Sequence, residues 1–163
     1  MNSFNITPDI FRKDCMKLAD QIKWSKYSSV YPIPKNGFAV LCEVNRHAEK
    51  DLKILYNPAE INAFTLIIDD LIDSGKTIIN LKKEYHLNIS DFYVLYRKND
   101  NNSILPGTSV YYVKDIEPIT WINFPWEIKR EDEDSHIIRL LEHKGLGINK
   151  ENIGKIRKFL TAL

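Results

Sequence analysis

The chain has 163 residues, of which 44% are hydrophobic and 28% charged, a composition typical of one globular domain with a sizeable core. Its formal net charge of +1 provides no overall field for nucleic acid or an anionic membrane, so we expect neither as a partner, and anion recognition requires a local site. No apolar leader or long apolar span is recognisable, and Cys15 and Cys42 fall on apolar helix faces, where we expect both in the core. We therefore expect a cytoplasmic, reduced protein without structural zinc.

The first third of the chain predicts a helix, a strand, a loop and a second helix. Residues 6–22, ITPDIFRKDCMKLADQI, have apolar side chains on one helical face, with Thr7 suited to cap the helix and Pro8 to begin it. Residues 28–38, SSVYPIPKNGF, predict a short strand followed by a loop. Residues 38–52, FAVLCEVNRHAEKDL, predict a helix that begins buried and ends in solvent.

The middle of the chain alternates strands with a helix and then becomes irregular. Strands are predicted at 53–57, 64–70, 91–98 and 109–116. A helix is predicted at 76–85. This order predicts an α/β fold with a mostly parallel sheet, helices on both faces and ligands at the carboxyl ends of the strands. Residues 117–135 predict irregular backbone, and the chain ends in two predicted helices, at about 134–143 and 150–163.

The stretch LIIDDLIDSGKTI, residues 66–78, runs a buried-looking strand into carboxylates and then a turn of small residues. Unpaired charge is expensive to bury, so Asp69 and Asp70 either bind a ligand or lie exposed. The following turn offers backbone N–H groups, hydroxyls and a helix N-terminus that together can bind a phosphate. A sugar phosphate satisfies both parts, with its hydroxyls or a bound Mg²⁺ facing the aspartates. The structural alternative is an acidic turn that Ser74 caps.

These residues carry a resemblance to a known family. LIIDDLIDSGKT resembles the 5-phosphoribosyl 1-diphosphate (PRPP) signature of the type I phosphoribosyltransferases, and TWINFPWE, residues 120–127, is similar to a segment of the bacterial xanthine-guanine phosphoribosyltransferases. The opening helix is also similarly placed, so the matches run over about 6–127. The resemblance implies a type I phosphoribosyltransferase fold over 1–127, with a small hood at 117–127, and leaves 128–163 as a C-terminal helical extension.

The resemblance also implies how PRPP is held. Asp69 and Asp70 would bind the ribose hydroxyls directly or through Mg²⁺, which makes Mg²⁺ the implied cofactor. Asp73 would lie near N7 of a purine as the general base or acid. The residues that would grip the 5′-phosphate are Asp73, Ser74, Gly75, Lys76 and Thr77. The residues that fall at the family's pyrophosphate loop, often with a strained peptide before the basic residue, are Lys35, Asn36 and Gly37.

The resemblance also implies how the purine base is bound. Lys98 matches the lysine that donates to the purine 6-oxo group, and Trp121 would stack on the ring. The Ile122 carbonyl would read the 2-substituent, with Glu127 nearby. Considered alone, Lys98 can be a solvated strand-end residue, and the tryptophans can form a core cluster or a dimer surface.

Two departures from the family affect PRPP handling. Only 31 residues separate Gly37 from Asp69, which leaves little chain for a mobile lid, and Lys-Asn-Gly replaces an Arg-Gly-Gly type of loop. Two hypotheses follow. The first is a salvage enzyme, a homodimer or homotetramer, that makes a nucleoside 5′-monophosphate and pyrophosphate from PRPP and guanine, xanthine or hypoxanthine, or a modified purine. The alternative is a catalytically weak or inactive PRPP- or nucleotide-binding regulatory module of the same fold.

Overall fold

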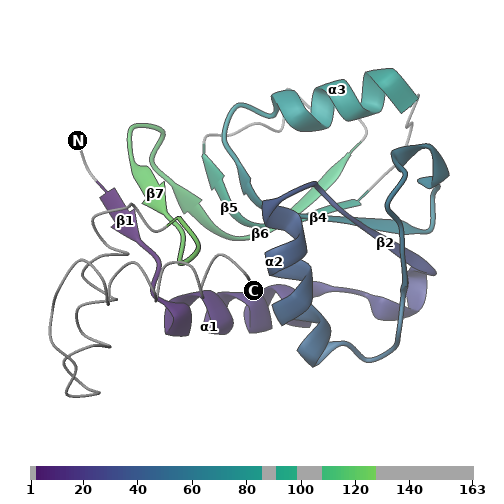
Figure 1. Cartoon of the computed structure of the whole chain (residues 1–163), viewed down its shortest axis with the longest axis horizontal. Helices are drawn as coiled ribbons and strands as arrows, with labels where there is room; N and C mark the ends of the chain where they lie inside the picture. The colour runs from purple at the N-terminus through teal and green to yellow at the C-terminus, as the bar shows by residue number, and fades with distance from the viewer. Residues whose placement is uncertain (1–2, 86–90, 99–107, 128–163) are drawn as a thin grey trace, which may run out of the picture. The chain divides into compact units, whose positions relative to one another are not determined.

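A computed structural model describes residues 3–85, 91–98 and 108–127 (Figure 1). The chain divides into two compact units, Met1–Ile122 and Asn123–Leu163. The described helices are α1 (Pro8–Gln21), α2 (Asn36–Val44) and α3 (Lys76–Tyr85), with short 3-10 turns at Trp24–Lys26, Asn45–His47 and Pro58–Glu60. The described strands are β1 (Ser3–Asn5), β2 (Ser29–Pro32), β3 (Lys53–Ile54), β4 (Thr65–Ile72), β5 (Asp91–Lys98), β6 (Ser109–Ile116) and β7 (Trp121–Asn123).

The first unit is built on a five-stranded sheet with the order β3-β2-β4-β5-β6. Every neighbouring pair of strands in it is parallel, which confirms the predicted mostly parallel sheet. The central strands β4 and β5 are almost entirely buried, as continuous apolar runs in covered parallel sheets are. Because all five strands point the same way, their carboxyl ends meet at one edge of the sheet.

Helices cover both faces of this sheet (Figure 1). On one face α3 contributes Ile78 to a buried cluster with Ile67 of β4 and Phe92 of β5. On the other face α1 and α2 pack against each other and against the strands. The predicted start of α1 is confirmed, because the Thr7 hydroxyl accepts a hydrogen bond from the Ile10 N–H at 3.3 Å and Pro8 is its first residue.

Three local predictions differ from the structure. The helix predicted over 38–52 ends at Val44, and residues 117–135, predicted as irregular, contain β7, which pairs with β1 in a two-stranded sheet. Cys15 is fully buried as expected, but Cys42 is exposed and its predicted core position is wrong. Val40 and Val44 face the core, and Cys42 lies about 200° around the helix from Val40, so it faces outward.

The predicted C-terminal extension, with its helices at 134–143 and 150–163, lies outside the described residues. The domain boundary after residue 127 therefore stays a prediction, whereas the division into compact units falls at Ile122. Within the described part of the chain, the helices are too short or too polar to cross a membrane.

Candidate functional site

Two adjacent carboxylates lie buried near the carboxyl end of β4. Asp69 is 8% exposed and Asp70 is 6% exposed. Asp69 Oδ1 accepts a hydrogen bond from the Asp70 N–H at 2.9 Å, and Asp70 Oδ2 accepts one from Asn36 Nδ2 at 2.8 Å. Among the described residues, no lysine, arginine or histidine forms an ion pair with either aspartate. Their charge is thus matched by one side-chain amide and by backbone groups.

Burial disfavours the charged form of both aspartates. The pKa of Asp69 is raised to about 8, mainly by burial and next by the neighbouring Asp70 carboxylate. Burial also raises the pKa of Asp70, although hydrogen bonds to Asp69 and Asn36 act in the opposite direction. A ligand that brings a cation or hydroxyl donors would remove the cost of two close carboxylates in a buried place.

The turn that follows β4 borders a small cavity of about 90 Å³. Its lining residues are Asp69, Leu71, Ile72, Asp73, Ser74, Gly75, Lys76, Thr77 and Ile78. Gly75 has a φ of 71°, which favours glycine, and its carbonyl accepts the hydrogen bond from the Ile79 N–H at 3.0 Å that begins α3. The first N–H groups of a helix have no carbonyl partner within it and attract anions, so this turn suits a phosphate. Asp69, one member of the acidic pair, lines the same cavity as the turn.

An ion pair joins the ends of β4 and β5. The strand register sets Ile72 opposite Arg97, so the next residues, Asp73 and Lys98, meet at the carboxyl edge. Lys98 Nζ lies 3.5 Å from Asp73 Oδ1. The Lys98 side chain is only 9% exposed, whereas the Asp73 side chain is 67% exposed, so solvent and ligands reach the carboxylate more easily. The structure thus brings together two residues that the sequence singled out separately.

The loop of Lys35, Asn36 and Gly37 leads into α2 at the same edge. Lys35 has a φ of 76° and a ψ of −90°, and it is the one residue other than glycine with a positive φ in the described ranges. Such strain is rare and persists only where neighbouring structure enforces it. The peptide before Lys35, where the resemblance implied strain, is not cis, and the unusual backbone conformation is that of Lys35 itself. A Cβ at Gly37 would lie 2.6 Å from the Ile68 carbonyl oxygen, so only glycine allows α2 to begin this close to β4.

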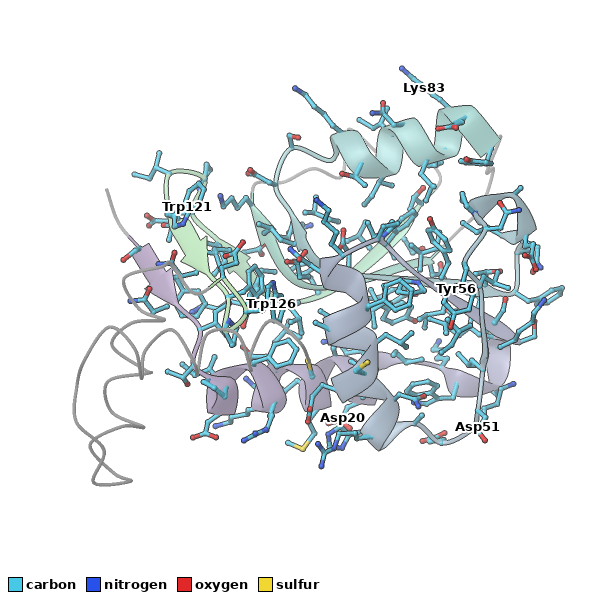
Figure 2. All side chains as sticks on the ribbon, in the orientation of Figure 1. Asp20, Asp51, Tyr56, Lys83, Trp121 and Trp126 are labelled. Atoms are coloured by element: carbon cyan, nitrogen blue, oxygen red, sulfur yellow. The ribbon has the colours of Figure 1, made fainter. Side chains whose placement is uncertain are left out.

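Three of the predicted base-binding residues lie in β7 or shortly after it in the sequence. Trp121, labelled in Figure 2, is 54% exposed on β7, whereas Ile122 is buried. Glu127 belongs to the second unit, where its carboxylate accepts a hydrogen bond from the Phe124 N–H at 3.1 Å. Neither Trp121 nor Ile122 lines the cavity at the turn. Their predicted roles therefore stay predictions.

One contact in this site was not foreseen. Sequence reasoning assigned Asn36 to the leaving group and Asp70 to the ribose, but not the hydrogen bond between them. The two residues are 34 positions apart, and they meet because α2 begins against β4. In the sequence, the glycine at position 37 is the feature that comes nearest to indicating that α2 begins so close to β4.

Comparisons with known proteins give the chain its relatives. No model of a known protein family matches the sequence. It is 25% identical over 145 residues to the xanthine-guanine phosphoribosyltransferase of Vibrio vulnificus, covering 78% of this chain and 90% of that protein. A purine phosphoribosyltransferase from Pyrococcus horikoshii has a TM-score of 0.58 at 21% identity, covering 78% of this chain and 95% of that one. A hypothetical protein from Neisseria gonorrhoeae with bound ppGpp has a TM-score of 0.62 at 20% identity, covering 86% of this chain and 98% of that one.

The parallel sheet, the flanking helices and these structural neighbours define an α/β protein with the type I phosphoribosyltransferase fold. The chain is related to the purine phosphoribosyltransferases of this type, in agreement with the sequence resemblance.

Proposed function

We propose that this protein is a purine phosphoribosyltransferase of purine salvage that acts on PRPP and a 6-oxopurine: guanine, xanthine or hypoxanthine. N9 of the purine forms a bond to C1 of the ribose, and the bond from C1 to the diphosphate oxygen breaks. The electrons of that bond leave with pyrophosphate, and the purine loses one proton. The protein must therefore place the base, hold the ribose phosphate, stabilise the leaving group and accept a proton.

One observation carries this proposal: Asp69 of the buried acidic pair and the phosphate-suited turn line the same cavity at the sheet edge. The carboxylates of Asp69 and Asp70 are acceptors for the two ribose hydroxyls. The N–H groups at the start of α3 would donate to the 5′-phosphate, whose charge the helix N-terminus also favours. A ribose phosphate satisfies both halves at once, which an isolated phosphate or a neutral sugar does not.

Magnesium fits this site as a cofactor shared with the substrate. In the described ranges no group of three or more His, Cys, Asp or Glu side chains could hold a metal. Mg²⁺ is commonly bound through one or two carboxylates together with substrate oxygens and water, which is what Asp69 and Asp70 offer. Their burial without an ion-pairing cation supports this role. When bound, Mg²⁺ would help to neutralise the diphosphate of PRPP.

The base end of the proposal rests on the ion pair at the ends of β4 and β5. O6 and N7 are neighbouring atoms on one edge of a 6-oxopurine. Lys98 Nζ and Asp73 Oδ1 are 3.5 Å apart, so the lysine can donate to O6 while the carboxylate accepts from N7–H. Asp73 would take the N7 proton as N9 attacks. In this proposal Trp121 stacks on the ring, the Ile122 carbonyl contacts the 2-substituent and Glu127 lies near it.

The test is pyrophosphate release from PRPP and Mg²⁺, with guanine, xanthine, hypoxanthine or adenine supplied separately. We expect release with 6-oxopurines and little with adenine, whose 6-amino group presents donors to Lys98. Asp73→Asn should lower the rate at least about 100-fold, because it removes the proton acceptor. Asp51→Asn is the matched control, since Asp51 is an exposed aspartate outside the site (Figure 2).

Each outcome decides between the two hypotheses. Release that Asp73→Asn removes and Asp51→Asn preserves establishes the transferase and ranks its bases. No release with any base, together with calorimetric binding of PRPP, GMP or ppGpp, would reject the enzyme and favour the regulatory module. The ligand ppGpp is included because it is bound in the Neisseria structure.

The proposal carries two further expectations. We expect the protein to be cytoplasmic, where its substrates are made, and to form a homodimer or homotetramer. Closed symmetric assemblies are the commonest state of soluble homo-oligomers. Light scattering of the purified full chain measures the assembly directly, and a monomer at micromolar concentration would contradict it.

A further inference from the structure

A single side-chain hydrogen bond connects the loop of Lys35, Asn36 and Gly37, here called the leaving-group loop, with the acidic pair. Asn36 is the first residue of α2, and its Nδ2 atom donates to Asp70 Oδ2 at 2.8 Å. Asp70 is buried and Asn36 is partly buried, so water competes poorly for this contact. Among the described residues, Asn36 supplies the one side-chain hydrogen bond to Asp70 from another part of the chain.

The loop that carries Asn36 is held on two sides. On the main-chain side, the Gly37 N–H donates to the Ile33 carbonyl at 3.1 Å, and Gly37 packs directly on the Ile68 carbonyl. On the side-chain side, Asn36 is fixed by Asp70. Between these contacts and β2 lies Lys35 in its strained conformation, with a φ of 76°. A strained residue keeps such a conformation only where its neighbours over-determine it, and Asn36 is one of those neighbours.

The chemistry of the contact leaves Asp70 able to bind a ligand. A carboxylate has about four acceptor sites on its two oxygens, and the Asn36 amide occupies one of them. The amide brings a donor without a charge, so it fixes the orientation of Asp70 and does not neutralise it. An aspartate or a leucine at position 36 could not do both.

We propose that Asn36 is a positioning residue that acts through Asp70, joining the leaving-group loop and the acidic pair so that they hold a magnesium–diphosphate ligand as one unit. The identity of the ligand as PRPP or pyrophosphate rests on the proposed function. The link itself rests on the geometry of α2 and β4. It gives a role to the asparagine of the Lys-Asn-Gly loop, at a position where an Arg-Gly-Gly type of loop has no side chain.

The competing explanation is that Asn36 only stabilises the start of α2. A double-mutant cycle separates the two, with Asn36→Ala, Asp70→Asn and the double variant in the full chain. Calorimetry measures the binding of Mg²⁺–PRPP and, separately, Mg²⁺–pyrophosphate, and urea unfolding checks that each variant is folded. Asn45→Ala is the matched control, because Asn45 is an exposed asparagine at the other end of α2.

We expect Asn36→Ala to weaken the binding of both ligands by about 10-fold, the effect of losing one hydrogen bond to a charged group. In the Asp70→Asn background the same change should have almost no further effect. Asn45→Ala should bind as the wild-type chain does. The inference is overturned if the two single effects multiply in the double variant, or if Asn36→Ala binds both ligands normally.

Failure of this inference is separable from failure of the proposed function. Turnover by the wild-type chain together with unchanged binding by Asn36→Ala would reject the positioning role and keep the transferase. Absence of turnover would reject the transferase, and the binding cycle would still decide whether Asn36 acts through Asp70. A wild-type chain that binds neither ligand overturns the inference, whatever the turnover assay gives.

Discussion

Buried carboxylates occur at both ends of the sheet, and they differ in the partners that the described residues supply. At the amino end of β5, Asp91 accepts a hydrogen bond from the Tyr27 hydroxyl at 2.5 Å and forms an ion pair with Lys26. At the carboxyl end of β4, Asp69 and Asp70 are equally buried, but from other parts of the chain they receive one side-chain amide, from Asn36. The described residues supply a cation and a hydroxyl to Asp91, and neither to Asp69 or Asp70.

The difference shows that burial alone does not mark a functional carboxylate. Asp91 is a buried charge with a protein partner, which is the usual condition for keeping one in a folded structure. Among the residues that the structure describes, the Asp69–Asp70 pair has no such cation, and burial raises the pKa of both residues. Perturbed carboxylates that line a cavity are typical of ligand sites, and Asp69 lines the cavity at the turn.

The largest expected effect comes from removing the acceptors at the carboxyl end. The double variant Asp69→Asn, Asp70→Asn should lower kcat/KM for pyrophosphate release at least about 100-fold, because it removes the charges that would bind the ribose hydroxyls and Mg²⁺. Asp20→Asn, an exposed aspartate on α1, is the control (Figure 2). Near-normal turnover by the double variant would show that the acidic pair is not part of the site.

The next largest effect is expected in the pH dependence of stability, to which the buried Asp69 should contribute. Between the ordinary Asp pKa of 3.8 and about 8, folded Asp69 keeps its proton and the unfolded chain has lost it. The folded state therefore binds more protons, and the free energy of unfolding falls as pH rises, by at most about 1.4 kcal/mol per pH unit. It levels off above about pH 8. Urea unfolding at several pH values should show a shallower fall for Asp69→Asn, and parallel profiles would contradict the raised pKa.

At the amino end of the sheet we expect a substitution to lower stability and to leave turnover unchanged. Asp91→Asn should lower the free energy of unfolding by about 1–3 kcal/mol, because it removes the negative charge that pairs with the Lys26 ammonium and strengthens the hydrogen bond from the Tyr27 hydroxyl. It should leave the turnover of each folded molecule unchanged, since Asp91 is the first residue of β5 and the candidate site lies at the carboxyl ends of the strands. Urea unfolding and active-site-normalised kinetics measure both properties, and a loss of turnover at full stability would break the comparison.

Sequence patterns predicted the carboxyl end better than the amino end. The alternation of strands and helices predicts the parallel sheet, and a parallel sheet brings strand ends such as Asp73 and Lys98 to one edge. Asp91 gave no comparable signal, because its partners Tyr27 and Lys26 lie 64 and 65 residues away. Their meeting depends on packing between segments that no local pattern relates.

Features that depend on close packing were also missed. The β1–β7 pair joins segments from the two ends of the described chain, and each strand has only three residues. The positive φ of Lys35 and the Asn36–Asp70 hydrogen bond both follow from how tightly α2 begins against β4. Residue type at a loop predicts a possible ligand, but the conformation that presents it is set by the neighbouring elements.

The smallest effect is expected where charges are paired in solvent. Lys53 Nζ and Glu60 Oε2 are 3.0 Å apart across the short segment between β3 and β4, with side chains 71% and 48% exposed. Lys53→Ala should lower the free energy of unfolding by less than about 1 kcal/mol, and added salt should reduce even that.

Leu55 and Ile61, both buried in the core cluster, hold the same segment, and Leu55→Ala should lower the free energy of unfolding by about 2–5 kcal/mol. Urea unfolding of both variants measures the contrast, and a cost for Lys53→Ala as large as that for Leu55→Ala would mean that this segment depends on its ion pair.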